Sequence, residues 1–90
     1  MMLISKEVMD MFKNKNGEKN NISGERIREL RLSHPQKLSQ RALADKMQLI
    51  GIDVDKNAIQ RIECGKRFVT DIELRAFAEI FGVSIEKLIV

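Results

Sequence analysis

The sequence has 90 residues, of which 43% are hydrophobic and 32% charged, and a formal net charge of +3. This composition is typical of one soluble globular domain and excludes a disordered chain. The single cysteine, Cys64, cannot form an internal disulfide and has no companions for a metal cluster, as expected in a reducing cytoplasm. No apolar run approaches the roughly 18 residues of a membrane span, and Lys6, Glu7 and Asp10 interrupt any signal-peptide pattern.

Charge is distributed unevenly along the chain. Residues 22–67 contain ten Lys and Arg against six Asp and Glu, whereas residues 68–90 contain two against four. A basic middle region predicts a surface that faces a polyanion. An uneven but merely solvated surface is the alternative that charge alone leaves open.

The first 21 residues differ in pattern from the rest. Residues 3–12 place Ile4, Val8, Met11 and Phe12 at helical spacing, which predicts an amphipathic helix too short to be stable unless it packs on something. Residues 13–21 contain no apolar side chain and predict a flexible linker. We therefore expect an arm and linker over residues 1–21 and a globular domain over residues 22–90.

Helix-capping residues recur at regular intervals from residue 23 onward. Ser23 is predicted to cap a first helix that ends at His34-Pro35. Ser39 is predicted to cap a second helix from Gln40 to about Leu49, with Gly51 as its stop.

The same signals predict three further helices. Asp55 caps the third and Gly65 closes it. The capping box Thr70-Asp71-Ile72-Glu73 opens a fourth that Gly82 ends, and a last short helix runs from Ser84 through Leu88. No segment shows sustained alternation, so we predict an all-α fold, a compact five-helix domain preceded by the N-terminal amphipathic helix. The expected core is formed by the inward apolar side chains Ile27, Leu30, Leu43, Ala44, Met47, Ile59, Ile62, Leu74, Phe77, Ala78 and Phe81.

The outer face of the third helix is polar. Opposite its apolar stripe lie Lys56, Asn57, Gln60 and Arg61. Arg and Lys donate to guanine O6 and N7, and Asn pairs with adenine, so these four residues are candidates for contacting DNA bases in the major groove. An ordinary solvated face is the alternative.

Other polar residues flank this helix. Gln40, in the first turn of the second helix, is placed either to bind a phosphate or to brace the third helix. Lys66 and Arg67 follow Gly65 in a loop whose backbone can lie against a sugar-phosphate strand, and Arg41 adds a nearby charge. We expect these residues to contact the DNA backbone.

Four blocks of sequence carry a resemblance to a known family. Their order along the chain is similar to that of the Cro/phage-repressor type of helix-turn-helix domain, the XRE family of bacterial regulators. The blocks are Ile-Arg-Glu-Leu-Arg (27–31), Leu-Ser-Gln-Arg-Ala-Leu-Ala (38–44), Ile-Gln-Arg-Ile-Glu-Cys-Gly-Lys-Arg (59–67) and Phe-Gly-Val-Ser-Ile-Glu-Lys-Leu (81–88).

The resemblance implies a repressor-like DNA-binding domain that acts as a transcriptional regulator, and nothing in the sequence predicts a cofactor. It implies a structural ion pair between Arg31 and Glu63, a phosphate contact from Gln40, and a backbone-contacting loop at residues 66–67. Lys56, Asn57 and Arg61 match its base-contacting positions, whereas Gln60 is supported by the helix face alone. We expect repression by a homodimer on an inverted repeat of double-stranded DNA.

The sequence departs from the family pattern between the second and third helices. The segment Gln-Leu-Ile-Gly-Ile-Asp-Val (48–54) is several residues longer than the tight turn of most members. Because Leu49, Ile50, Ile52 and Val54 are apolar, we expect the segment to pack on the domain. We expect about one more helical turn, followed by an extended crossing. His34-Pro35-Gln36-Lys37 lengthens the first connection slightly.

Three other classes of function compete with DNA binding. No carboxylate pair or Cys/His set stands at catalytic spacing, so we predict no catalytic residues and no enzyme. The better alternative is an antitoxin or protein-interaction module, in which residues 3–12 bind a partner protein. The same residues could instead form a dimerisation helix or fold back on their own domain. RNA binding is disfavoured because the chain has no Tyr or Trp for base stacking.

Overall fold

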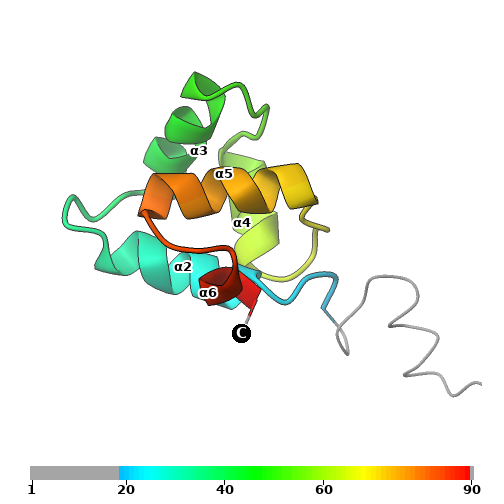
Figure 1. Cartoon of the computed structure of the whole chain (residues 1–90). Helices are drawn as coiled ribbons and strands as arrows, with labels where there is room; N and C mark the ends of the chain where they lie inside the picture. The colour runs from blue at the N-terminus through cyan, green and yellow to red at the C-terminus, as the bar shows by residue number, and fades with distance from the viewer. Residues whose placement is uncertain (1–18, 90) are drawn as a thin grey trace, which may run out of the picture.

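The computed structural model describes residues 19–89, and the elements of this region are all α-helices (Figure 1). The predicted all-α, five-helix fold is therefore confirmed. The amphipathic helix predicted for residues 3–12 and the linker up to residue 18 lie outside the described residues. The helices are α2 (Gly24–Ser33), α3 (Gln40–Leu49), α4 (Lys56–Glu63), α5 (Asp71–Phe81) and α6 (Glu86–Ile89).

Three of the predicted N-caps form as expected. The Ser39 hydroxyl accepts from Ala42 N, and the Asp55 carboxylate accepts from Ala58 N at 2.7 Å. At α5 the complete capping box is present, with Thr70 and Glu73 each satisfying a backbone N–H of the other. These bonds begin α3, α4 and α5 at the residues that the sequence predicts, because they satisfy donors that a helix itself leaves unpaired.

The start of α2 differs from the prediction. Ser23 occupies the cap position, but its side chain makes no capping bond. The Asn21 side-chain oxygen instead accepts from Gly24 N at 2.8 Å. Asn21 is buried in the domain, so the domain includes residues that the sequence pattern assigned to a flexible linker.

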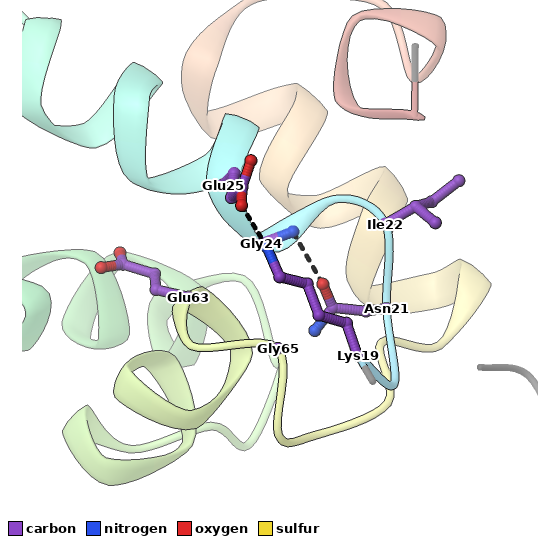
Figure 2. Close-up of a pocket in the computed structure, with 7 residues that line it drawn as sticks. All are labelled: Lys19, Asn21, Ile22, Gly24, Glu25, Glu63 and Gly65. Atoms are coloured by element: carbon purple, nitrogen blue, oxygen red, sulfur yellow. Dashed lines mark hydrogen bonds and ion pairs between the residues drawn. The ribbon is translucent and has the colours of Figure 1, made fainter. Parts of the chain in front are cut away.

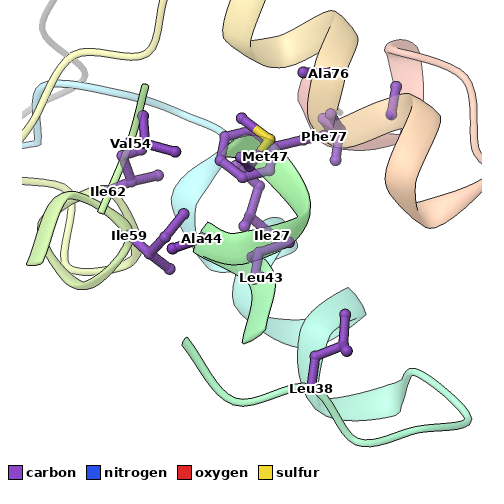
Figure 3. Packing of buried hydrophobic residues seen from close by; sticks show 12 residues of the cluster. Ile27, Leu38, Leu43, Ala44, Met47, Val54, Ile59, Ile62, Ala76 and Phe77 are labelled. Atoms are coloured by element: carbon purple, nitrogen blue, oxygen red, sulfur yellow. The ribbon is translucent and has the colours of Figure 1, made fainter. Parts of the chain in front are cut away.

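The core lies where α2, α3, α4 and α5 face one another. In Figure 3 the side chains of Ile27, Leu43, Met47 and Phe77 gather at its centre, and each is fully buried. Ile59 and Ile62 of α4 are also fully buried, as their inward spacing predicts. Leu30, Leu74 and Phe81, also expected in the core, are only partly buried and pack around its edge.

In the connection between α3 and α4, only the residues after Gly51 pack against the core. Val54 is 1% exposed and Ile52 is partly buried against the core. Leu49 and Ile50, which were expected to pack too, are 85% and 45% exposed. Because α3 ends at Leu49 and the chain turns at Gly51 (φ 88°), these two side chains point outward before the extended stretch returns to the core.

The C-terminal part follows the sequence closely. Gly82 ends α5 in the left-handed conformation (φ 66°), where a side chain would be strained. α6 begins two residues later than predicted, after a turn in which Ser84 O accepts from Lys87 N. None of the helices within residues 19–89 is long and apolar enough to cross a membrane.

Candidate nucleic-acid interface

The outer face of α4 presents the four polar side chains singled out from the sequence. Lys56, Asn57, Gln60 and Arg61 are all exposed, whereas the opposite stripe of the helix is fully buried. Residues 56 and 60 are four apart, as are residues 57 and 61, so each pair lies one helical turn apart on the same side of α4. A single α-helix of this kind fits the width of the major groove.

The C-terminal end of α4 is fixed by a buried ion pair. Arg31 Nε and Nη2 donate to the two carboxylate oxygens of Glu63 at 2.7 and 2.9 Å. The Arg31 and Glu63 side chains are 10% and 2% exposed. The pair implied by the family resemblance is thus present in the structure, and it joins α2 to the last residue of α4.

Two more hydrogen bonds extend this pair to α3. Arg31 Nη1 donates to Leu38 O at 3.0 Å, just before α3, and Gln40 Nε2 donates to Glu63 at 3.1 Å. Of the two roles considered for Gln40, the brace on α4 is therefore the one that the structure displays. The buried charges are paired and hydrogen-bonded, as their burial demands.

The loop after α4 contains Lys66 and Arg67, and the two residues lie in different surroundings. Lys66 is exposed. Arg67 turns toward α5, where its two terminal nitrogens each donate to Glu73 at 2.9 Å. These bonds give Arg67 a role in the structure of the loop, and its expected contact with the DNA backbone stays a prediction.

The surroundings of Glu73 also shift its protonation. Burial alone would raise the pKa of the Glu73 carboxyl, but hydrogen bonds from Arg67 and from Thr70 N bring that pKa below its usual value. The hydrogen bond with Glu73 likewise raises the pKa of the Arg67 guanidinium. Both groups therefore stay charged at neutral pH and hold the loop to the start of α5.

Several cations around α4 remain available to a ligand. Within residues 19–89, Arg41, Lys56, Arg61 and Lys66 are exposed and have no ion-pair partner. Unpaired, exposed Lys and Arg side chains can replace the counterions of a nucleic-acid phosphate backbone. They come from α3, α4 and the loop after α4.

Sequence patterns missed the role of residues 19–21. Asn20 and Asn21 make hydrogen bonds to the end of α4 and to the loop beyond it. Lys19 pairs with Glu25 beside a small pocket at the start of α2 (Figure 2). The available signal was the preference of Asn for the residues just before a helix, where its side chain bonds a backbone N–H.

Within residues 19–89 there is no group of three or more His, Cys, Asp or Glu side chains that could hold a metal ion. Cys64, at the C-terminal cap of α4, is exposed and not in a disulfide.

Comparison with known proteins agrees with this geometry. A helix-turn-helix family model matches residues 27–88, from the middle of α2 to α6. No significant match was found among curated proteins or among solved structures. The matched range contains α3 and α4, the polar face of α4 and the loop after it. The chain belongs to the helix-turn-helix family of the Cro/phage-repressor type, the XRE family, whose members are DNA-binding transcription regulators.

Proposed function

We propose that the chain is a sequence-specific transcriptional repressor that places α4 in the major groove of double-stranded DNA. The observation that carries the proposal is the exposed row of Lys56, Asn57, Gln60 and Arg61 on a helix whose other face and C-terminal end are anchored. These side chains are assigned to base edges, because their donors and acceptors match those of guanine and adenine.

Phosphate contacts are assigned to Arg41, in the first turn of α3, and Lys66, in the loop after α4, which have no ion-pair partner among the described residues. Gln40 is retained as a phosphate contact as well, because its amide nitrogen carries a second N–H beyond the one that Glu63 accepts. Arg67 is not part of this assignment, because both terminal nitrogens donate to Glu73 and Nη1 also donates to Phe68 O, which turns the guanidinium toward α5. Such contacts position the helix without selecting a sequence.

We further propose that two copies act together on an inverted repeat, since paired half-sites are how a helix of this size gains affinity and selectivity. Protein bound to such a DNA site would block access of the transcription machinery, which makes repression the expected effect. Selection of bound duplexes from a random DNA library, at near-physiological salt, tests the proposal directly.

Two matching half-sites with centres about 34 Å apart, one helical turn, are the expected result. A single unpaired half-site would contradict the dimer and leave base recognition standing. Recovery of no enriched sequence by folded protein would contradict the proposed function itself. Light scattering of the protein with and without the selected duplex distinguishes a preformed dimer from one that assembles on DNA.

A further inference from the structure

The Asn21 side chain joins three separate parts of the domain. Its oxygen accepts from Gly24 N at the start of α2. Its Nδ2 donates to Ile62 O in the last turn of α4 at 3.0 Å and to Arg67 O in the following loop at 2.8 Å. The residue is only 9% exposed, so these bonds form largely out of water. Figure 2 shows the side chain between α2 and the loop at Gly65.

Asn20 strengthens the same attachment. Its backbone N–H donates to Gly65 O at 2.7 Å, and its side chain donates to Lys66 O at 2.9 Å. We name Asn20 and Asn21 the clasp. The clasp therefore bonds the carbonyl oxygens of three consecutive residues, 65 to 67, and that of Ile62 in α4. Lys66 lies at the centre of this run.

Close packing leaves little room for the clasp to shift. A Cβ added at Gly24 would lie 2.1 Å from Ile62 O and 2.9 Å from the Asn21 side-chain oxygen. The start of α2 thus touches the end of α4 directly, with Asn21 beside the contact. An amide suits this place because it accepts from one backbone group while donating to two others.

We propose that Asn21, supported by Asn20, is a positioning residue for DNA binding: the clasp holds Lys66 in the place where it meets a phosphate. The inference rests on the proposed function. A loop that is already ordered loses less conformational entropy on binding, so its lysine contributes more to affinity. Without the clasp, Lys66 would sample positions away from the DNA backbone and its contribution would fall.

An alternative role for Asn21 is the capping of α2 alone, and Asn21→Asp separates the two roles. Aspartate keeps the shape and the acceptor for Gly24 N, and it is as good a helix cap as asparagine. It cannot donate to Ile62 O or Arg67 O, and it places a carboxylate against both carbonyls. The added charge can weaken DNA binding by itself, but if capping were the whole role, Asn21→Asp would leave the effect of Lys66→Ala unchanged.

The experiment measures binding of the full chain to a labelled mixed-sequence duplex across a series of salt concentrations. The proteins are the wild type, Lys66→Ala, Asn21→Asp and the double variant. In an otherwise wild-type chain, Lys66→Ala should weaken binding. It should also lower by about one unit the slope of the logarithm of the binding constant against the logarithm of the salt concentration. Asn21→Asp alone should cause most of the same loss, and adding Lys66→Ala to it should change the slope little.

Two further variants guard the interpretation. Asn20→Ala removes only the side-chain bond to Lys66 O, so it tests the same coupling more mildly if Asn21→Asp fails to fold. Val83→Ala removes core contacts beyond the end of α5, away from the clasp and the loop, and should leave the full effect of Lys66→Ala in place. If Lys66→Ala weakens binding equally with and without the clasp, or if Val83→Ala also erases its effect, the inference is overturned. If Lys66→Ala has no effect in the wild type, the proposed DNA surface fails instead.

Discussion

Arg61 and Lys66 are both exposed cations near the end of α4, yet the proposed interface gives them different tasks. Arg61 projects from the helix itself, whereas Lys66 stands on the loop beyond it. A side chain on a helix in the groove can reach base edges, and one on the loop can reach only the strand that borders the groove.

The variants Arg61→Ala and Lys66→Ala should therefore differ in kind. Arg61→Ala is expected to relax preference at one base position, by about 1–3 kcal/mol, with little change in binding to random DNA. Lys66→Ala should weaken binding to every sequence and flatten the dependence on salt. Dissociation constants on the selected operator, its single-base variants and random duplex would check both. Equal losses on specific and random DNA for both variants would contradict these role assignments.

At the scale of elements, the connection from α3 to α4 combines an anchored part with an exposed part. Val54 lies in the core and Gln48 Nε2 donates to Val54 O at 3.0 Å, which ties the connection back to α3. Directly afterwards Asp55 caps α4. The position of the proposed recognition helix therefore depends on Val54 more than on the exposed apolar residues before Gly51.

Val54→Ala should lower the free energy of unfolding by about 2 kcal/mol, because it removes buried methyl groups and leaves a cavity. Leu49→Ala is the matched control from the same connection and should change that free energy by no more than about 0.5 kcal/mol, since its side chain is 85% exposed. Urea denaturation followed by circular dichroism measures both. A larger loss from Leu49→Ala would mean that something covers this side chain in solution.

The ion pair between Arg67 and Glu73 joins the loop after α4 to α5. It predicts that the stability of the folded protein depends on pH in the acid range. Since the pKa of Glu73 is lowered in the folded protein, its contribution is complete above the unfolded value, about 4.3, and is lost as pH falls through the folded value. Wild type should therefore exceed Glu73→Gln in stability by a constant margin from neutral pH to about pH 5.

Below about pH 5 that margin should shrink, and thermal unfolding of the two proteins across this range measures it. Glu79→Gln, at an exposed site on the same helix, controls for the loss of one carboxylate. A margin that stays constant down to about pH 3 would show that the charge on Glu73 contributes nothing.

The ion pair between Arg31 and Glu63 holds several helices of the molecule together. It links α2 with α4, and its further bonds to Leu38 O and Gln40 bring in the start of α3. A domain of this size has a total stability of only about 5–10 kcal/mol. Losing one partner of such a pair is therefore expected to affect the entire fold.

Arg31→Met should lower the free energy of unfolding by about 3–5 kcal/mol, because it leaves the Glu63 carboxylate buried beside Gln40 without its cation. The double variant Arg31→Met, Glu63→Leu should recover much of this loss, since an apolar pair leaves no charge unpaired. Urea denaturation of the two variants and the wild type is the measurement. If the double variant were as unstable as Arg31→Met, the loss would come from the packing of the two side chains and not from the unpaired charge of Glu63.

The helices, three of their N-caps and most of the core follow from patterns within short stretches of the sequence. A cap such as Ser39 or Asp55 acts on a backbone N–H three residues away, and an apolar stripe repeats with the turn of one helix, so both are visible in a short stretch of chain. The exposed face of α4 follows from the same periodicity, because the side opposite a buried stripe faces solvent.

The partners of polar side chains that meet across the fold become visible only once the chain is folded. Asn21 bonds carbonyls 41 and 46 residues away, Gln40 bonds Glu63, and Arg67 turns to Glu73 instead of outward. Likewise, Leu49 and Val54 are both apolar, and only the path of the connection leaves one exposed and the other buried. An amide or guanidinium can satisfy its hydrogen bonds with many partners, so its role depends on which segments the folded chain brings within reach.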